Sequence, residues 1–342
     1  MQGADRAPGR ALLVAGPTCS GKSALALLLA NHLGGTIINA DSMQIYRELR
    51  VLTARPTAAD EARVPHLLYG VRPASEAGSV AWWRAAALAA MAVSRDGGRV
   101  PILCGGTGMY LASLTTGLAA VPDPGAAARA EARALLAELG APGLHARLAA
   151  HDPASASRLR PSDGQRVARA WEVWRGTGRG LAAWQAERRT APPDWTFAAI
   201  LLDPPRPALR AAIAERFAAM LREGALEEVR AVRALGLSPA LPSMRAHGVP
   251  ELSAYLDGAI TLDDAASRVV AATGRYIKRQ ATWFRHHPLA AGQRTIGARW
   301  KEGAQFPENH MADLRSFLYG PVDGPAMCPY ASAQHPGMRD DG

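Results

Sequence analysis

A glycine-rich segment near the N-terminus carries the clearest chemistry in this sequence. Residues 16–23 match the pattern G-x-x-x-x-G-K-S and lie between an apolar run and a helix-forming stretch. In such a loop, backbone N–H groups wrap a phosphate, the lysine adds a charge, and the serine hydroxyl ligates Mg²⁺. A chance glycine-rich turn is disfavoured, because one of only three lysines stands here. The expected phosphate-binding residues are Gly16, Pro17, Thr18, Cys19, Ser20, Gly21, Lys22 and Ser23, with Ser23 as the metal ligand.

The loop alone does not identify the phosphate compound. Phosphate-loop kinases and ATPases add an acidic residue after a second apolar strand, where it holds Mg²⁺. Here the candidate strand at residues 101–104 runs into Gly-Gly-Thr with no acid. The missing acid weakens the case for ATP as the substrate.

Two polar residues follow predicted strands, at the edge where α/β sheets bind their ligands. Asp41 follows a strand predicted over residues 36–40, and Thr107 follows one predicted over residues 99–104. Asp41 is either a helix N-cap or a general base or Mg²⁺ anchor that faces the loop, and one residue can do both. Thr107 is either a turn hydroxyl or a hydrogen-bond partner of Asp41.

Arginine recurs beside aromatic residues later in the chain. Basic stretches occupy residues 165–169 and 278–285, the second contains Trp283, and Arg245 lies between them. This pattern is typical of RNA binding, because guanidinium groups bind phosphates and aromatic faces stack on bases. The alternative is a set of solvated helix faces with Trp283 in the core. The net charge of +9 favours a polyanionic partner, although a genomic bias toward arginine would give the same excess.

A parallel sheet would bring these residues to one edge. Strands are predicted over residues 11–15, 36–40, 99–104, 196–203 and 294–296, and helices over residues 22–33 and 80–94. Alternating strands and helices in the first ~110 residues indicate a right-handed parallel arrangement. We therefore predict an α/β fold whose core is a P-loop NTPase-like parallel sheet.

The pattern changes in the middle of the chain. Between residues 121 and 190 no strand is evident, and helices are predicted over residues 124–138, 143–149 and 163–175. Further helices are predicted over residues 206–235, 249–256 and 262–286. We expect a catalytic core formed by residues 1–118 and 196–318, a helical insertion subdomain at 119–195, and a disordered tail at 319–342.

Composition bounds the setting in which the protein works. Hydrophobic residues make up 48% and charged residues 20%, as in soluble globular proteins. No apolar run is long enough to span a membrane, and the N-terminal apolar stretch is too short for an export signal. Cys19, Cys104 and Cys328 are too few and too scattered for a disulfide framework or a cysteine-rich zinc site. We expect a cytoplasmic monomer.

Several short motifs follow one another in a distinctive order. They are Gly-Pro-Thr-x-Ser-Gly-Lys-Ser at residues 16–23, Ala-Asp-Ser-Met-Gln-Ile-Tyr at 40–46, Thr-Ala-Arg-Pro at 53–56 and Cys-Gly-Gly-Thr-Gly-Met-Tyr at 104–110. Residues 163–169, 184–185, 242–245 and 278–285 continue the series. Over about residues 10–290 the chain resembles the tRNA dimethylallyltransferase family, in its bacterial form without a Cys/His zinc finger.

The resemblance implies a Mg²⁺-dependent reaction. A dimethylallyl group passes from dimethylallyl diphosphate to the N6 amine of adenosine 37, next to the anticodon, in tRNAs that read codons beginning with U. By similarity the loop binds the diphosphate, Asp41 accepts a proton from the amine, Thr107 positions the base and Arg216 meets the diphosphate. The helical insertion would contact the anticodon stem-loop. The implied tRNA contacts are Asp41, Ser42, Met43, Gln44, Thr107, Arg129, Gln165, Arg166, Val167, Ala168, Arg169, Arg245, Lys278, Arg279, Gln280 and Arg285.

The sequence departs from the family pattern at a few positions. Leu52 stands where the family usually has glycine, Trp171 stands where leucine is common, and residues 245–250 lack a usual Gly-Tyr pair. These differences affect individual RNA contacts and not the reaction.

Three other functions share part of this pattern. A small-molecule phosphate-loop kinase would turn over ATP and has no use for the late basic segments. Enzymes that prenylate free AMP or ADP share the loop, the aspartate and the Gly-Gly-Thr element, but resemble this chain less over the insertion and residues 278–285. An RNA-binding module that only senses a nucleotide would leave Asp41 without a role.

Overall fold

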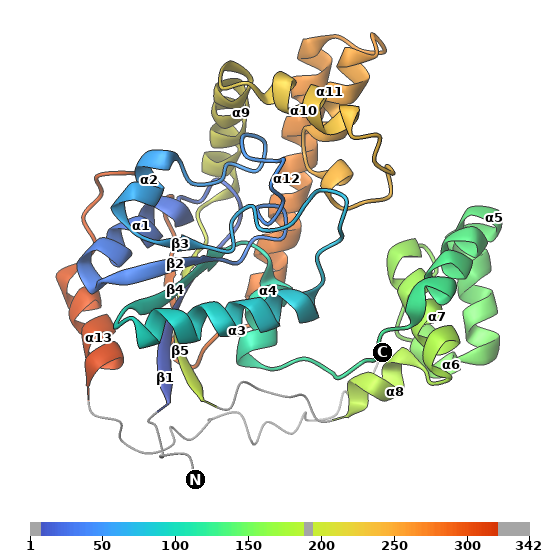
Figure 1. Ribbon diagram of the computed structural model, residues 1–342, viewed down its shortest axis with the longest axis horizontal. Coiled ribbons are helices and arrows are strands. Elements are labelled where there is room, and N and C mark those ends of the chain that lie inside the picture. The colour runs from blue at the N-terminus through green and yellow to red at the C-terminus, as the bar shows by residue number, and fades with distance from the viewer. Residues whose placement is uncertain (1–7, 188–193, 321–342) are drawn as a thin grey trace, which may run out of the picture. The chain divides into compact units, whose positions relative to one another are not determined.

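Six strands form one sheet in the order β3-β2-β4-β1-β5-β6, with every neighbouring pair parallel (Figure 1). The strands are β1 (Gly9–Ala15), β2 (Gly35–Asn39), β3 (His66–Leu67), β4 (Val100–Gly105), β5 (Trp195–Leu202) and β6 (Arg294–Ile296). The computed structural model describes residues 8–187 and 194–320. The predicted α/β fold with a parallel sheet is confirmed, and the two-residue strand β3 is an addition to it.

Helices cover both faces of this sheet because its central strands are buried on both sides. On one face lie α1 (Lys22–Leu33) and α13 (Glu308–Tyr319). Leu25 and Leu29 of α1 and Leu314 of α13 pack with Leu12 and Val14 of β1. Helix α1 has the predicted bounds and ends at a left-handed glycine, Gly34.

The other face is covered by α3 (Val80–Asp96), α4 (Gly108–Thr115) and the C-terminal part of α12 (Leu262–His286). Trp83 of α3 stacks on Tyr110 of α4 with ring centroids 4.4 Å apart. The Trp83 indole also donates to the carbonyl oxygen of Asn39, the last residue of β2. These helices therefore fix the end of β2, where the site begins.

A further group of helices extends from the carboxyl edge of the sheet, above it in Figure 1. It contains α9 (Arg206–Arg222), α10 (Ala225–Ala234), a 3₁₀ turn at Ser243–Arg245, α11 (Val249–Leu256) and the N-terminal part of α12. Its apolar core joins Phe217, Val229 and Leu252 to Ile45 and Leu49 from the loop after β2. A short helix in that same loop, α2 (Ala58–Arg63), begins with a capping box between Thr57 and Asp60.

The chain divides into two compact units, and the second comprises residues 116–192. In its described part it contains α5 (Gly125–His151), α6 (Pro153–Ala156), α7 (Gly164–Thr177) and α8 (Leu181–Ala186). Gly140 has non-helical angles (φ 66°, ψ 176°) and divides α5 into the two helices expected there. The core of this unit is apolar and includes Leu144, Leu148, Val167 and Trp171.

Two expectations from the sequence concern membrane-spanning helices and the tail at residues 319–342. Among the described helices, none combines the length and the apolar character needed to cross a membrane. Most of the tail predicted at residues 319–342 lies outside the described residues, which end at residue 320.

Candidate active site

The phosphate loop lies between β1 and α1, at the carboxyl edge of the sheet. Gly16 adopts φ 148°, and a Cβ there would come within 2.4 Å of the Leu202 carbonyl oxygen. Gly21 adopts φ 94° and directly precedes the first turn of α1. Glycine satisfies both conditions, so the backbone turns tightly and can present N–H groups to an anion at the start of the helix.

Lys22 lies against this loop. Its Nζ donates to the Pro17 carbonyl oxygen over 2.8 Å. Burial lowers the pKa of the ammonium, and the Arg216 charge acts in the same direction, whereas Cys104 and Asp41 oppose it. A buried cation is costly without a counter-charge, so the loop is suited to an anionic ligand.

Gln280 joins the loop to the turn after β4. Its Oε1 accepts from the Thr18 N–H and its Nε2 donates to the Gly106 carbonyl oxygen, each over 2.9 Å. The side chain is 5% exposed. Both ends of the amide of this expected tRNA contact are thus engaged inside the protein, where they link the loop to the turn after β4.

Asp41 is fixed by the buried residue at the end of β2. The Asp41 N–H donates to Asn39 Oδ1 over 2.8 Å, and Asn39 Nδ2 donates to the Asp41 carbonyl oxygen over 3.0 Å. No helix begins after Asp41, so the helix-cap interpretation is wrong. Its Oδ1 instead accepts from the Met43 N–H over 2.9 Å, which closes a side-chain turn. The backbone thus holds the carboxylate in one orientation.

Thr107 bonds to the neighbour of Asp41. Its Oγ1 accepts from the Ser42 N–H over 2.9 Å and donates to Ser42 Oγ over 3.2 Å. Its own N–H donates to the Ala40 carbonyl oxygen. These bonds join the ends of β2 and β4 through Ser42. Asp41 was the partner anticipated for Thr107, and the observed partner is the next residue in the chain.

A cavity opens beside the loop and brings predicted catalytic residues and loop residues together. Thr18, Asp41 and Arg216 line it, and Arg216 Nη1 lies 3.4 Å from Thr18 Oγ1 and 3.7 Å from Cys19 Sγ. The apolar wall consists of Leu52, Ile213, Phe217, Met220 and Val269. The cavity thus places an anion-binding end and a carboxylate next to a surface suited to a short hydrocarbon.

Tyr276 of α12 lines the same cavity and was not singled out in the sequence. Burial raises the pKa of its phenol, the Asp41 charge raises it further, and hydrogen bonds with Thr107 and Gln280 act against this. The phenol therefore stays protonated at neutral pH, as a hydrogen-bond donor next to the carboxylate. Helical spacing relates Tyr276 to Gln280, and that was the available signal.

A second hollow lies beside the loop. Lys22, Ser23, Tyr69, Cys104 and Arg299 are among its lining residues. Ser23 is exposed at the first turn of α1. Among the described residues, no group of three or more His, Cys, Asp or Glu side chains is placed to hold a metal ion. A metal here would take its ligands from Ser23, from a bound diphosphate and from water.

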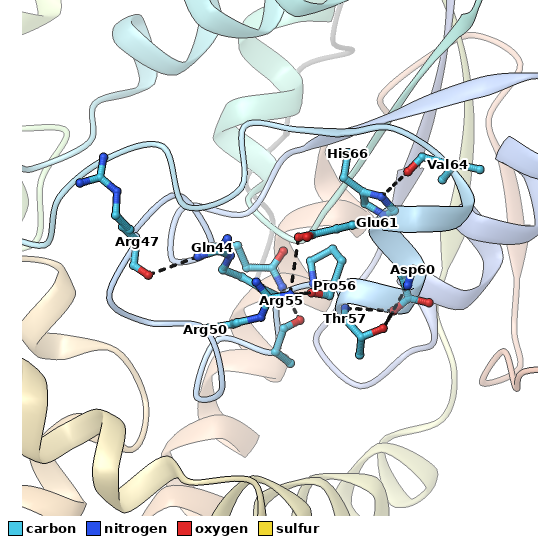
Figure 2. A network of polar contacts seen from close by, with 11 residues as sticks. Gln44, Arg47, Arg50, Arg55, Pro56, Thr57, Asp60, Glu61, Val64 and His66 are labelled. Carbon is cyan, nitrogen blue, oxygen red and sulfur yellow. Dashed lines mark hydrogen bonds and ion pairs between the residues drawn. The ribbon is translucent and has the colours of Figure 1, made fainter.

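The segment after Asp41 folds back on itself through a polar network (Figure 2). Gln44 Nε2 donates to the carbonyl oxygens of Thr53 and Ala54 over 2.8 and 2.9 Å. Arg50 donates to the Pro56 carbonyl oxygen and lies 3.7 Å from Glu61. Gln44, an expected tRNA contact, is thus engaged in holding the loop that carries the cavity residues Leu52 and Thr53.

The late basic residues occupy exposed positions in the first unit. Arg245 lies in the 3₁₀ turn, and Lys278, Arg279 and Arg285 lie on α12. Arg279 is placed over the Tyr276 ring, 5.5 Å from its centroid. Their exposure leaves these cations accessible to a polyanion.

The tRNA contacts predicted in the second unit differ in their exposure. Gln165 and Arg166 are exposed on α7, whereas Val167 and Ala168 lie in the core of the unit. The side chains of these two expected tRNA contacts are buried and hold the helix in place. Arg169 pairs with Glu172 over 3.1 Å, and Arg129 pairs with Asp123.

Comparisons with known proteins agree on one family. The model of the IPP transferase family matches residues 44–287, and that of the isopentenyl transferases matches residues 9–71. The chain is 61% identical over 311 residues to the tRNA dimethylallyltransferase of Granulibacter bethesdensis, covering 90% of this chain and 98% of that protein. It is 59% identical over 324 residues to that of Gluconacetobacter diazotrophicus, covering 94% and 98%.

Solved structures support the same assignment. The crystal structure of the tRNA isopentenylpyrophosphate transferase from Bacillus halodurans has a TM-score of 0.61 at 29% identity, covering 92% of this chain and 96% of that one. A eukaryotic dimethylallyltransferase acting on tRNA has a TM-score of 0.74 at 23% identity, covering 91% and 79%, which speaks for the fold alone. With this fold, this site and these sequence relatives, the chain belongs to the tRNA dimethylallyltransferase family.

Proposed function

We propose that this chain transfers the dimethylallyl group of dimethylallyl diphosphate to the N6 amine of adenosine 37 in tRNAs that read codons beginning with U. One observation carries the proposal: Asp41 and Arg216 line a single cavity with Thr18 of the phosphate loop. A base for the amine thus lies beside the cation and the loop that receive the leaving group.

The reaction breaks the bond between C1 of the dimethylallyl group and the bridging oxygen, and forms a bond between C1 and N6. The electron pair of the broken bond leaves with the diphosphate, whose growing charge is stabilised by Lys22, Arg216 and the loop amides. The proton of the amine passes to the Asp41 carboxylate. The apolar wall at Phe217 and Met220 holds the hydrocarbon and excludes water.

Thr107 and Tyr276 complete the acceptor side in this proposal. The Tyr276 phenol remains a donor because burial and the Asp41 charge raise its pKa. Thr107 accepts a hydrogen bond from the Ser42 N–H and is itself hydrogen-bonded to the Tyr276 phenol. The two hydroxyls would orient the adenine while Asp41 takes its proton.

Ser23 is exposed beside Lys22 at the loop and would supply one oxygen ligand to Mg²⁺, with the diphosphate of the donor supplying others. When bound, the metal neutralises charge on the diphosphate and makes it a better leaving group. The protein alone contributes the loop amides, the two cations and the hydroxyl.

The RNA partner is the anticodon stem-loop of tRNA. Arg245, Lys278, Arg279 and Arg285 would bind its phosphates from the first unit. In the second unit the exposed residues Gln165 and Arg166 and the half-buried Arg129 and Arg169 would add contacts. We expect a monomer that works in the cytoplasm, where tRNA is modified.

A prenylation assay tests the proposal. The protein is incubated with Mg²⁺, dimethylallyl diphosphate and an unmodified anticodon stem-loop, and the digested RNA is analysed by mass spectrometry. We expect one dimethylallyl group on adenosine 37 and none on a matched stem-loop with guanosine there. Consumption of free AMP or ATP without modification of the RNA would refute the assignment.

A further inference from the structure

A segment near the C-terminus runs against the phosphate loop. After β6 the chain reaches Arg299, whose Nε donates to the Cys19 carbonyl oxygen over 3.1 Å. The next residue, Trp300, donates its N–H to the Ser20 carbonyl oxygen over 2.9 Å. Two consecutive outer carbonyls of the loop are therefore held by two consecutive residues that lie about 280 positions later, beyond the stretches matched by the family models.

These carbonyls control the direction of the loop amides. A peptide group is planar, so fixing the Ser20 carbonyl also fixes the N–H of Gly21 on the opposite side of the same plane. Cys19 has φ 63°, a left-handed conformation that is unfavourable for a residue with a side chain. The bond from Arg299 to the Cys19 carbonyl stabilises that conformation.

Trp300 anchors the segment. Its side chain is buried in the core on the α1 face of the sheet and contacts the Phe306 ring. A Cβ on Gly21 would come within 2.1 Å of the Trp300 carbonyl oxygen. Gly21 therefore serves two purposes, because it permits the turn of the loop and leaves space for the Trp300 backbone.

Arg299 also brings a charge to the site. Its side chain lines the second hollow together with Lys22, Ser23 and Arg216. Arg216 reaches the loop at the Cys19 sulfur, and Arg299 reaches it at the Cys19 carbonyl oxygen. Two guanidinium groups from α9 and from the C-terminal segment thus meet the same loop residue.

We propose that Arg299 is a positioning residue for the diphosphate, a role that rests on the proposed function of the loop. Its Nε–H holds the Cys19 carbonyl and with it the left-handed turn of the loop at Cys19, and its charge adds to the attraction for the leaving group. Trp300 anchors this segment against Gly21. The segment contacts the donor side of the site and none of the described residues assigned to RNA.

The test compares three variants in the full chain. Arg299→Ala removes both the bond and the charge, Arg299→Lys keeps the charge but lacks the planar Nε–H, and Lys301→Ala removes a nearby charge that does not line the hollow. Calorimetry with inorganic pyrophosphate and Mg²⁺ gives donor-side affinity, and steady-state kinetics give separate KM values for donor and tRNA.

For Arg299→Ala we expect a dissociation constant for pyrophosphate and a donor KM raised about three- to tenfold, with the tRNA KM unchanged. Arg299→Lys should show part of this defect, and Lys301→Ala should match the wild type. Equal pyrophosphate affinity in Arg299→Ala and wild type would overturn the proposal. So would wild-type affinity in Arg299→Lys, or an equal loss in Lys301→Ala.

These measurements distinguish a failure of the proposed function from a failure of the proposed role of Arg299. If the wild-type protein binds pyrophosphate but modifies no tRNA, the proposed function fails. If it modifies tRNA while Arg299→Ala is indistinguishable from it, only the positioning role fails. Thermal unfolding of each variant shows whether lost binding reflects a lost fold.

Discussion

At the residue scale, the site separates the group that takes a proton from the groups that receive the leaving charge. Asp41 is held by Asn39 and by the Met43 N–H, while Lys22 and Arg216 lie at the loop. Asp41 and Lys22 are each fixed by a backbone atom close in sequence, whereas Arg216 reaches the side chains of Thr18 and Cys19. Catalytic geometry of this kind requires little rearrangement when the substrates bind.

Asp41→Asn tests the assignment of the base. Asparagine retains an oxygen that accepts from the Met43 N–H, so the turn is preserved while the basic carboxylate is lost. We expect kcat to fall by about 10²- to 10⁴-fold with pyrophosphate affinity close to wild type. Asp313→Asn, at an exposed position on α13 that lines neither hollow, is the control. Activity close to wild type in Asp41→Asn would leave Asp41 with a structural role only.

Cys104 makes stability depend on alkaline pH. Burial raises the pKa of its thiol from an ordinary value of 9.0 to about 11, with Lys22 acting in the opposite direction. Below about pH 9 both states keep the proton. Between about pH 9 and 11 the unfolded chain has lost a proton that the native protein retains, so the free energy of unfolding decreases as the pH rises.

Urea unfolding of the wild type and of Cys104→Ala between pH 8 and 11 measures this effect. The decrease with pH should be smaller in Cys104→Ala, because all other ionisable groups are common to both proteins. Parallel curves for the two proteins would mean that the thiol does not contribute.

At the element scale, helix α10 holds the loop that forms one wall of the cavity. Glu228 accepts from the N–H groups of Arg50, Val51 and Leu52 over 2.6, 2.7 and 2.9 Å. Leu52 lines the cavity and packs where a side chain on Gly248 would otherwise lie. The position of Leu52 in this wall therefore depends on the Glu228 carboxylate of α10.

Glu228→Gln replaces one acceptor oxygen with an NH₂ group that meets backbone donors. We expect a loss of about 1–3 kcal/mol in the free energy of unfolding, and a raised KM for the donor, because the wall is displaced. Glu227→Gln changes the neighbouring, exposed carboxylate, which pairs with Arg230, and should change stability by less than about 0.5 kcal/mol. Denaturant unfolding measures both, and similar values for the two variants would contradict this role of Glu228.

Element bounds were predictable where local signals were strong. Helices α1, α11 and α12 and strand β6 have the bounds expected from the sequence, because apolar spacing and caps such as Thr261 mark their ends. Helices α4 and α13 and the two-residue β3 were not anticipated. A strand as short as β3 has no detectable alternation, and it exists only because β2 offers a paired edge.

The residue types of the site were predictable from the sequence, but the hydrogen-bond partners of these residues were not. The loop, Asp41 and Arg216 were expected, and the structure brings Asp41 and Arg216 to one cavity with Thr18 and Cys19 of the loop. The engagement of Gln280 with Thr18 and Gly106 joins residues far apart in sequence, and only the fold shows that both ends of the amide are satisfied internally. The same holds for Arg299, whose partner is a backbone carbonyl that no sequence pattern can reveal.

At the scale of the whole molecule, exposed cations should govern the affinity for tRNA. Because bound phosphates release counterions, the logarithm of the association constant should fall linearly with the logarithm of salt concentration. Replacing Arg279 and Arg285 with glutamine should weaken binding and reduce the slope by about one unit per lost phosphate contact. Arg315→Gln, on α13, is the control, because α13 packs on the face of the sheet opposite to that covered by α12.

Filter binding or fluorescence anisotropy at several salt concentrations provides the measurement. The three arginines are all exposed, so the variants differ in position and not in burial. A salt slope unchanged in the double variant, or lowered equally by Arg315→Gln, would show that α12 does not form the RNA surface.

The hydrogen bonds that Gln280, Arg299 and Trp300 make with the phosphate loop have a consequence for biosynthesis. A nascent chain acquires the loop motif first, and the residues that hold Thr18, Cys19 and Ser20 leave the ribosome about 260 to 280 residues later. A protein fragment that ends before residue 280 contains the whole motif and none of these partners. We therefore expect the nascent chain to bind the donor fully only after Gln280, Arg299 and Trp300 have been synthesised and have folded back onto the loop after β1.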